Sequence, residues 1–448
     1  MKNPNAGFRR CDMPNWNDIY KSKLMSIEDA VSKVKAGDDI VVAMCANEPQ
    51  GFMGKLHEAA GWAEDVKVFS CLTLLPYDFY MKPEMRGKFE LNSWFHTANI
   101  RETVKKGYGT TTFVPNMLHR AATDRMYAKT PDIFVGVCTP PDRHGNVNLG
   151  MSLTYEKDVA ENAKLVILEV NENMPRGMGD TMMNVRNVDI FIENTKPVPE
   201  MPGMQPSEID MKIGANIAEL VDDGSTIQLG IGGIPNAAAL SLKDKRELGV
   251  HTEMFVDSMM DLYEMGVITN SRKGFMKDRA ITTFCMGSKR LYDFVDDNPV
   301  VEFHRGRWVN DPCVIRQNTK MVSINTCLSV DLTGQVASES LGSIQYSGTG
   351  GQSDTAIGAV EGLDGKGKSI IACYSTAKGG TISTITPMLA EGTFVTLHRS
   401  NVDFVVTENG IAALRGRSVR QRAQALISVA HANFREELTA KAKAMGLM

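Results

Sequence analysis

The chain has 448 residues, of which 43% are hydrophobic and 23% charged, and its formal net charge is −4. This length predicts two large or three small domains, since one ordinary domain holds roughly 150 residues. The near-neutral charge, with no lysine- or arginine-rich run, argues against partners such as nucleic acid or an anionic membrane. No secretory leader and no apolar run long enough to span a bilayer are present, so we expect a cytoplasmic protein.

Short apolar, β-branched runs alternate with helical periodicity along the chain. The runs predicted to be buried strands lie at residues 38–45, 66–72, 132–138, 164–170, 225–232, 280–286, 320–326, 368–375 and 403–409. Helical patterns occur between or after them, for example at 26–37 and 420–445. Buried strands separated by helices predict an α/β fold with largely parallel or mixed sheets.

A proline-rich segment divides the chain into two halves. Residues 196–208 read KPVPEMPGMQPSE, a composition that sustains neither a helix nor a central strand. We therefore expect an N-terminal domain over residues 1–197 and a C-terminal domain over residues 206–448.

The two halves contain similar patterns at nearly constant spacing. A helix–Gly–strand pattern occurs around Gly37 and again around Gly224, and the strand-like residues 66–70 correspond to 253–257 at the same offset. These matches predict two similar open α/β domains that arose by duplication, although common α/β punctuation is the alternative. Two such domains place a ligand in the cleft between them, close to the carboxyl ends of strands.

The eight cysteines are scattered and form no C-x-x-C pair. They mostly occupy strand-like apolar runs and have no histidine at metal-site spacing. We interpret them as reduced core thiols, and we expect neither a metal nor a bound prosthetic group.

Two glycine-rich turns are candidates for ligand binding. The segment QLGIGGIPN, residues 228–236, ends a predicted strand and precedes a helix, so its free N–H groups suit an anion. It departs from the dinucleotide fingerprint because proline occupies position 235. The segment SGTGGQSD, residues 347–354, lies in a similar position and is suited to binding an oxyanion. Ordinary turns are the alternative for both.

Glu253 opens an apolar run, HTEMFVD, that is predicted to be buried. Burying a lone carboxylate costs free energy unless the group is paired or used in chemistry. The alternative is a solvated glutamate at the edge of a strand, with no functional role. No serine or cysteine with a histidine partner competes as nucleophile, and G-x-S-x-G is absent. We interpret His251 as a packing or hydrogen-bonding residue rather than a general base.

Taken together, several segments resemble the acetyl-CoA hydrolase/transferase family. The matching segments are PPDRHGNVNLG, QLGIGGIPNA, LGVHTEMFVD and GTGGQSD, and the likeness covers nearly the whole chain. Within the family it is greatest to the CoA-transferases of short acids such as 4-hydroxybutyrate, butyrate and acetate. The resemblance implies that each half has the CoA-transferase α/β fold, with the active site in the cleft between them.

The resemblance also assigns roles to residues. Glu253 matches the catalytic glutamate that forms a glutamyl-CoA thioester. The residues implied in CoA binding are Gly230, Ile231, Gly232, Gly233, Ile234, Leu328, Gly351 and Lys378. Backbone groups of Gly232, Gly350 and Gly351 would stabilise oxyanions, and the acyl pocket would be walled by Asn47, Glu48, Met259 and Ser353.

The expected activity is acyl-CoA:carboxylate CoA transfer by ping-pong chemistry. The substrates would be CoA thioesters and small carboxylates, and we expect a homodimer or other homo-oligomer. Two alternatives remain open from the residues. One is an acyl-CoA hydrolase that uses the same glutamate with water as acceptor, and the other is a non-catalytic sensor of CoA esters.

Overall fold

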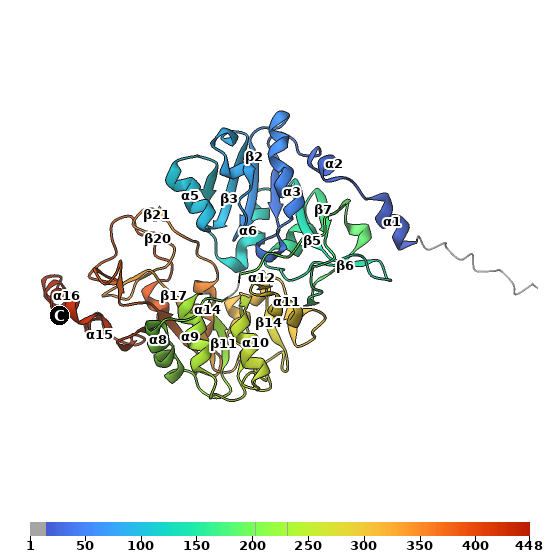
Figure 1. The fold of residues 1–448 in the computed structure, drawn as a ribbon. Helices are drawn as coiled ribbons and strands as arrows, with labels where there is room; N and C mark the ends of the chain where they lie inside the picture. The colour runs from blue at the N-terminus through green and yellow to red at the C-terminus, as the bar shows by residue number, and fades with distance from the viewer. Residues whose placement is uncertain (1–14, 202, 231) are drawn as a thin grey trace, which may run out of the picture.

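The computed structural model describes residues 15–201, 203–230 and 232–448, and two halves are visible in it, each built on a sheet flanked by helices (Figure 1). The N-terminal half, blue to green, lies beside the C-terminal half, green to red, and the carboxyl ends of both main sheets point toward the junction. The expected α/β class is confirmed by the sheets.

The N-terminal sheet has seven parallel strands in the order β10-β7-β5-β1-β2-β3-β4. Nearly every residue of its central strands is buried, as in other parallel sheets that are covered on both faces. The strands are β1 Asp39–Val42, β2 Val66–Cys71, β3 Phe89–Phe95, β4 Thr111–Phe113, β5 Ile133–Cys138, β7 Leu165–Val170 and β10 Ile190–Glu193.

The C-terminal sheet has the strand order β12-β11-β17-β22-β26-β27, and β27 alone runs antiparallel to its neighbour in this sheet. The chain leaves β11 to β12 on one side and later returns to β17 on the other, so the strand order reverses at β11. The strands are β11 Thr226–Leu229, β12 Gly249–Val250, β17 Met321–Thr326, β22 Lys368–Ala372, β26 Phe404–Thr407 and β27 Gly410–Ala413.

The two sheets share a neighbour order. The series β10-β7-β5-β1-β2 of one half matches β26-β22-β17-β11-β12 of the other, and all these strands are parallel. Gly37 and Gly224, which precede β1 and β11, have φ of 74° and 73°. The similar topology of the two halves therefore agrees with the repeated patterns in the sequence.

One detail of the predicted repeat is wrong. The strand corresponding to β2 is β12 rather than the run at 253–257, because β13 (Met254–Phe255) leaves the main sheet and pairs with β15 (Phe284–Cys285). The predicted strand at 280–286 is also divided, into β14 (Ala280–Thr282) and β15. This irregular region carries Glu253.

The helices are shorter than the sequence pattern predicted in places. The pattern at 26–37 forms helix only at Ile27–Val31, and the one at 420–445 forms two helices, separated at His431, whose side chain caps the second. The N-terminal helices are α1 Trp16–Ser22, α2 Ile27–Val31, α3 Gln50–Lys55, α4 Asp78–Met81, α5 Ala98–Lys106, α6 Ala121–Ala128 and α7 Glu156–Ala160. The C-terminal helices are α8 Glu208–Glu219, α9 Gly233–Ser241, α10 Asp257–Glu264, α11 Lys289–Val295, α12 Gly306–Val309, α13 Pro312–Ile315, α14 Gln352–Val360, α15 Val419–Val429 and α16 Ala432–Ala444.

The junction between the halves is packed. One apolar core cluster contains Phe134 and Leu168 of the N-terminal sheet together with Ile227 and Ile324 of the C-terminal sheet. A short strand of the N-terminal half, β8 (Met178–Gly179), also pairs with β16 (Val301–Phe303). Shared burial of this kind holds the two sheets in a fixed relation. Within the described residues, no helix has both the length and the apolar character needed to cross a membrane.

Candidate active site

A cavity of about 160 Å³ lies where the carboxyl ends of the two sheets meet. Strand β11 contributes Gln228 and Leu229, with Gly230 just after it, and β17 contributes Asn325 and Thr326. The cavity therefore lies at the point where the C-terminal strand order reverses. The N-terminal half contributes residues at the ends of β2 and β3 and beyond. The other lining residues are Cys71, Leu72, Phe95, Leu118, Glu253, Met254, Phe284, Ser338 and the turn from Ser347 to Gln352.

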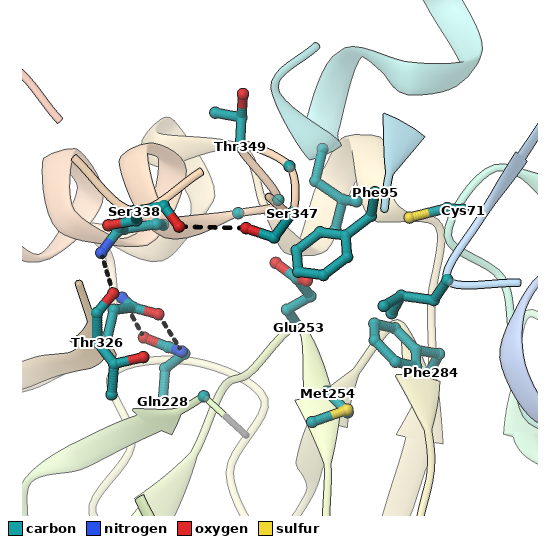
Figure 2. Close-up of a pocket in the computed structure, with 18 of the residues that line it drawn as sticks. Cys71, Phe95, Gln228, Glu253, Met254, Phe284, Thr326, Ser338, Ser347 and Thr349 are labelled. Carbon is teal, nitrogen blue, oxygen red and sulfur yellow. Dashed lines mark hydrogen bonds between the residues drawn. The ribbon is translucent and has the colours of Figure 1, made fainter. Parts of the chain in front are cut away.

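Glu253 lies at the centre of this cavity (Figure 2). Its backbone carbonyl accepts hydrogen bonds from the N–H groups of Thr283 and Phe284, each at 3.1 Å. These bonds fix the start of β13 against β15. The side chain is then free to extend into the cavity, where its Oε2 accepts a hydrogen bond from Asn310 Nδ2 at 3.1 Å.

Burial raises the pKa of Glu253 to about 7, and the nearby carboxyl of Asp354 adds to the rise. The hydrogen bonds from Asn310 and from the Gly351 backbone oppose it by stabilising the charged form. A carboxylate that is weakly solvated and has a raised pKa is a better nucleophile than one in water, and such shifts are typical of functional sites.

The second glycine turn packs directly on this carboxyl. A Cβ at Gly351 would overlap Glu253 Oε2 and Asn310 Nδ2, so only glycine fits there. Gly350 has φ of 52°, in the left-handed region, and α14 begins immediately after the turn. The turn therefore lies directly against the Glu253 carboxyl.

The N-terminal half holds this turn in place. The N–H groups of His96 and Leu118 donate to the carbonyls of Ser347 and Gly350, each at 3.1 Å, and a Cβ at Gly348 would overlap the carbonyl of Trp94. The glycine turn is therefore positioned by both halves.

A third contact joins His119 to Asp354, which is on the first turn of α14. His119 Nδ1 lies 2.8 Å from Asp354 Oδ1, and the His119 N–H donates to Oδ2 at 3.1 Å. Burial raises the pKa of Asp354, which His119 partly offsets, and the hydrogen bond to Asp354 raises the pKa of His119.

The first glycine turn is only partly in the cavity. Gly230 lines it, whereas Gly232 caps α9 with φ of 119° and Gly233 packs against Asp210. The described residues that line the cavity do not include Gly232, Gly233 or Ile234. Ile231 lies outside the residues that the structure describes.

Two other predicted CoA contacts lie beyond the cavity wall. Leu328 lies two residues past the end of β17, and its N–H donates to Ala337 O at 2.9 Å. Lys378 is exposed at the tip of the hairpin formed by β23 (Thr376–Ala377) and β24 (Ile382–Ser383). Their roles in CoA binding stay predictions.

The four residues predicted for the acyl pocket are buried behind the cavity rather than exposed in it. Asn47 Nδ2 donates to Leu149 O at 2.6 Å, and Glu48 accepts from Leu74 N at 2.6 Å, with burial raising the pKa of Glu48 to about 8. Met259 is a core residue of α10. The hydroxyl of Ser353 donates to Thr396 O at 2.6 Å.

His251 is buried, and burial and Lys273 lower its pKa to about 3. Its Nε2 lies 2.7 Å from Val309 O, to which a neutral imidazole donates. His251 is not among the residues that line the cavity, which is consistent with a packing and hydrogen-bonding role.

Sequence reasoning missed several residues of the site. Asn325 is a polar residue at the end of a predicted apolar strand, a signal that could have marked it, and Gln228 was included only as the first residue of the glycine-rich segment 228–236, without a role of its own. Phe95 belongs to β3, which was not predicted, and Asn310 follows the short helix α12 without any local signal.

Among the described residues, no group of three or more His, Cys, Asp and Glu side chains is placed to hold a metal ion.

Two family models match the chain: the acetyl-CoA hydrolase/transferase N-terminal domain at residues 8–202 and the C-terminal domain at residues 287–442.

Named relatives cover almost the full chain. A 4-hydroxybutyrate coenzyme A transferase of Clostridium kluyveri is 41% identical, over 94% of this chain and 98% of that protein. A butyryl-CoA:acetate CoA-transferase of Anaerostipes caccae is 34% identical, over 95% and 96%.

Solved structures agree with these matches. RipA from Yersinia pestis has a TM-score of 0.92 and 35% identity, over 97% of this chain and 100% of that one. A 4-hydroxybutyrate CoA-transferase from Porphyromonas gingivalis has a TM-score of 0.79 and 32% identity, over 96% and 100%.

Proposed function

Because this chain belongs to the acetyl-CoA hydrolase/transferase family, we propose that it is an acyl-CoA:carboxylate CoA-transferase that works through a thioester on Glu253. The observation that supports this most directly is the place of the Glu253 carboxyl, in a cavity between the halves and against the Gly351 turn. Short acids such as 4-hydroxybutyrate, butyrate and acetate are the proposed substrates, in keeping with the names of the relatives.

The chemistry requires no net proton transfer. A carboxylate oxygen of Glu253 attacks the thioester carbonyl, the C–S bond breaks, and CoA leaves as a thiolate with an acyl–glutamyl anhydride left behind. The thiolate then attacks the glutamyl carbonyl and releases the first acid as its carboxylate. The resulting Glu253 thioester reacts with the acceptor carboxylate by the reverse steps.

The surroundings of Glu253 suit these steps. The N–H groups of Gly350 and Gly351 would bind the oxyanion of each tetrahedral intermediate, an effect worth ~3 kcal/mol per donor at comparable sites. Asn310 would hold the carboxylate in one rotamer by its 3.1 Å hydrogen bond. Glu253 is only partly exposed, and the apolar side chains beside it would limit the access of water, which would otherwise hydrolyse the thioester.

The remaining roles are proposals for the outer site. Gly230, Gly232, Gly233, Ile234, Leu328 and Lys378 would contact CoA as it approaches from the carboxyl end of β11. Asn47, Glu48, Met259 and Ser353 would act from behind the cavity wall by fixing the residues that line it. We also propose that the protein is cytoplasmic and forms a homo-oligomer, and light scattering of the purified protein tests the assembly.

Labelled acetate and butyryl-CoA test the function. Labelled acetyl-CoA is the expected product, whereas release of free CoA without acetyl-CoA would identify a hydrolase. With butyryl-CoA alone, mass spectrometry is expected to find CoA on the peptide that contains Glu253, and borohydride is expected to trap it by reduction. Adduct formation in Glu253→Ala would refute the assignment of the nucleophile.

A further inference from the structure

The cavity has a polar side and an apolar side, with the Glu253 carboxyl between them (Figure 2). On the polar side Gln228 and Asn325 exchange side-chain hydrogen bonds at 3.2 Å in both directions, and Ser347 Oγ donates to Ser338 O at 3.1 Å. The apolar side carries Cys71, Phe95, Met254 and Phe284 (Figure 2), and Leu72 and Leu118 are further apolar residues of the lining. A thioester carbonyl at Glu253 thus has a different environment for each of its two substituents.

The polar side fits the CoA arm. The pantetheine chain carries two amide groups, and the Gln228–Asn325 pair offers both donors and acceptors to amides. This side also adjoins Gly230, through which the proposed CoA path runs. The acyl tail is then left to the apolar side.

The apolar side contains no cation. Among the described residues that line the cavity, none is lysine, arginine or histidine, and Glu253 is the charged one. A second carboxylate on the acyl tail would lose its water there without gaining a counter-ion, and it would lie near the charge of Glu253.

The cationic groups near this wall are already engaged. His119 is bound to Asp354, and Arg101 Nη1 donates to the carbonyls of His96 and Tyr346, each at 3.0 Å. His96, the residue after Phe95, is buried, and burial lowers its pKa, which favours the neutral ring.

We propose that the acyl subsite selects monocarboxylic acids with an uncharged tail and rejects dicarboxylic acids of the same length. The inference rests on the proposed function, and it names the substrate class on the apolar side of the same cavity. It separates this chain from relatives whose names include succinyl-CoA as a donor.

Three CoA thioesters separate charge from size: butyryl-CoA, succinyl-CoA and the methyl ester of succinyl-CoA. Each is supplied with acetate, and the rate of its consumption is measured above an enzyme-free control. We expect kcat/KM for succinyl-CoA to be roughly 100-fold or more below that for butyryl-CoA, with the uncharged methyl ester within about 20-fold of butyryl-CoA. Succinyl-CoA consumed within about tenfold of butyryl-CoA would overturn the proposal, as would equally slow consumption of both succinyl donors.

The products of the same assay test the function separately. Acetyl-CoA formed from succinyl-CoA at a high rate would refute the subsite and leave CoA transfer intact. Free CoA formed in place of acetyl-CoA, with the expected order of donors, would refute transfer and leave the subsite intact. If no donor is consumed, both fail.

A lysine placed on the apolar side provides a second arm. Phe95 is partly exposed, so Phe95→Lys disturbs the core less than a change at Met254 or Phe284 would. We expect the succinyl-to-butyryl ratio of kcat/KM to rise about tenfold in Phe95→Lys and to stay unchanged in the uncharged control Phe95→Met. An unchanged ratio in a folded Phe95→Lys variant would argue against the placement of the acyl tail on the apolar side. If the variant does not fold, the three thioesters tested with the wild type decide whether the proposal stands.

Discussion

Asp354 receives two hydrogen bonds from one residue of the other half of the molecule, His119. The imidazole Nδ1 lies 2.8 Å from one carboxyl oxygen and the backbone N–H donates to the other at 3.1 Å. Asp354 is the third residue of α14, which directly follows the glycine turn that packs on Glu253. The contact therefore links the relation of the two halves to the geometry of the reacting carboxyl.

His119→Ala is expected to lower kcat about tenfold, which corresponds to ~1.4 kcal/mol, with a smaller effect on KM. The variant leaves Asp354 buried without its side-chain partner, so the pKa of Asp354 rises and its neutral form no longer raises the pKa of Glu253. The acidic limb of the pH–rate profile should then move to lower pH. Steady-state kinetics across pH 5 to 9 measure both effects.

His119→Asn is the matched control, because its amide can donate where Nδ1 does. It should recover most of the lost kcat. If alanine and asparagine behave alike and the limb does not move, His119 has only a structural role.

The pH dependence of the wild type follows from Glu253. Its pKa is raised to about 7, and only the ionised carboxylate attacks the thioester. The value of kcat/KM should therefore rise with pH through about 7 and level off above it. Initial rates with butyryl-CoA and saturating acetate give the profile. A profile that is flat down to pH 5 would mean that the carboxyl is better solvated than its surroundings indicate.

Replacement of Glu253 by glutamine should remove transfer and also change stability in a pH-dependent way. The pKa of the carboxyl is raised from its ordinary value of 4.5 to about 7 in the folded state. The folded protein therefore binds more protons than the unfolded chain between pH 4.5 and 7, and it loses stability as pH rises through this window. Neutral glutamine has no such loss. Glu253→Gln should therefore gain on the order of 1–3 kcal/mol relative to wild type between pH 5 and pH 8. Urea denaturation at both pH values measures the gain, and an equal difference at the two values would contradict it.

Much of this site could be expected from the sequence, for physical reasons that differ between its parts. Glu253 and Gly351 stood out because a lone carboxylate and a glycine cluster are unusual next to apolar runs. Phe95 and Leu118 could not be placed, since they reach the cavity only when the N-terminal sheet docks on the C-terminal one. The departure of β13 from the main sheet was equally hidden, because it depends on the distant partner β15.

Lys378 offers a test of the outer CoA site. It is exposed on a hairpin tip, so a contact with a CoA phosphate would be screened and modest in strength. Lys378→Ala should raise the KM for butyryl-CoA about two- to fivefold with little change in kcat. At 0.5 M salt the Debye length falls to roughly 4 Å, so the difference in KM between the variant and the wild type should disappear. Lys366→Ala, at another exposed lysine, is the control. An effect confined to the KM for acetate would place Lys378 elsewhere in the reaction.

Gly351→Ala tests the contact between the glycine turn and the nucleophile. The φ of Gly351 is −100°, which alanine also adopts, so the backbone is not strained and the new methyl group acts by overlap with Glu253 Oε2 and Asn310 Nδ2. The carboxyl must then rotate away, and we expect kcat to fall about 100-fold, which corresponds to ~2.7 kcal/mol. The yield of the CoA adduct detected by mass spectrometry should fall in parallel.

Gly54→Ala is the control, because Gly54 lies in α3 with open space at its Cβ. Alanine there should leave kcat unchanged and add up to ~1 kcal/mol of stability. Full activity in Gly351→Ala would show that the carboxyl reacts from a position away from the turn.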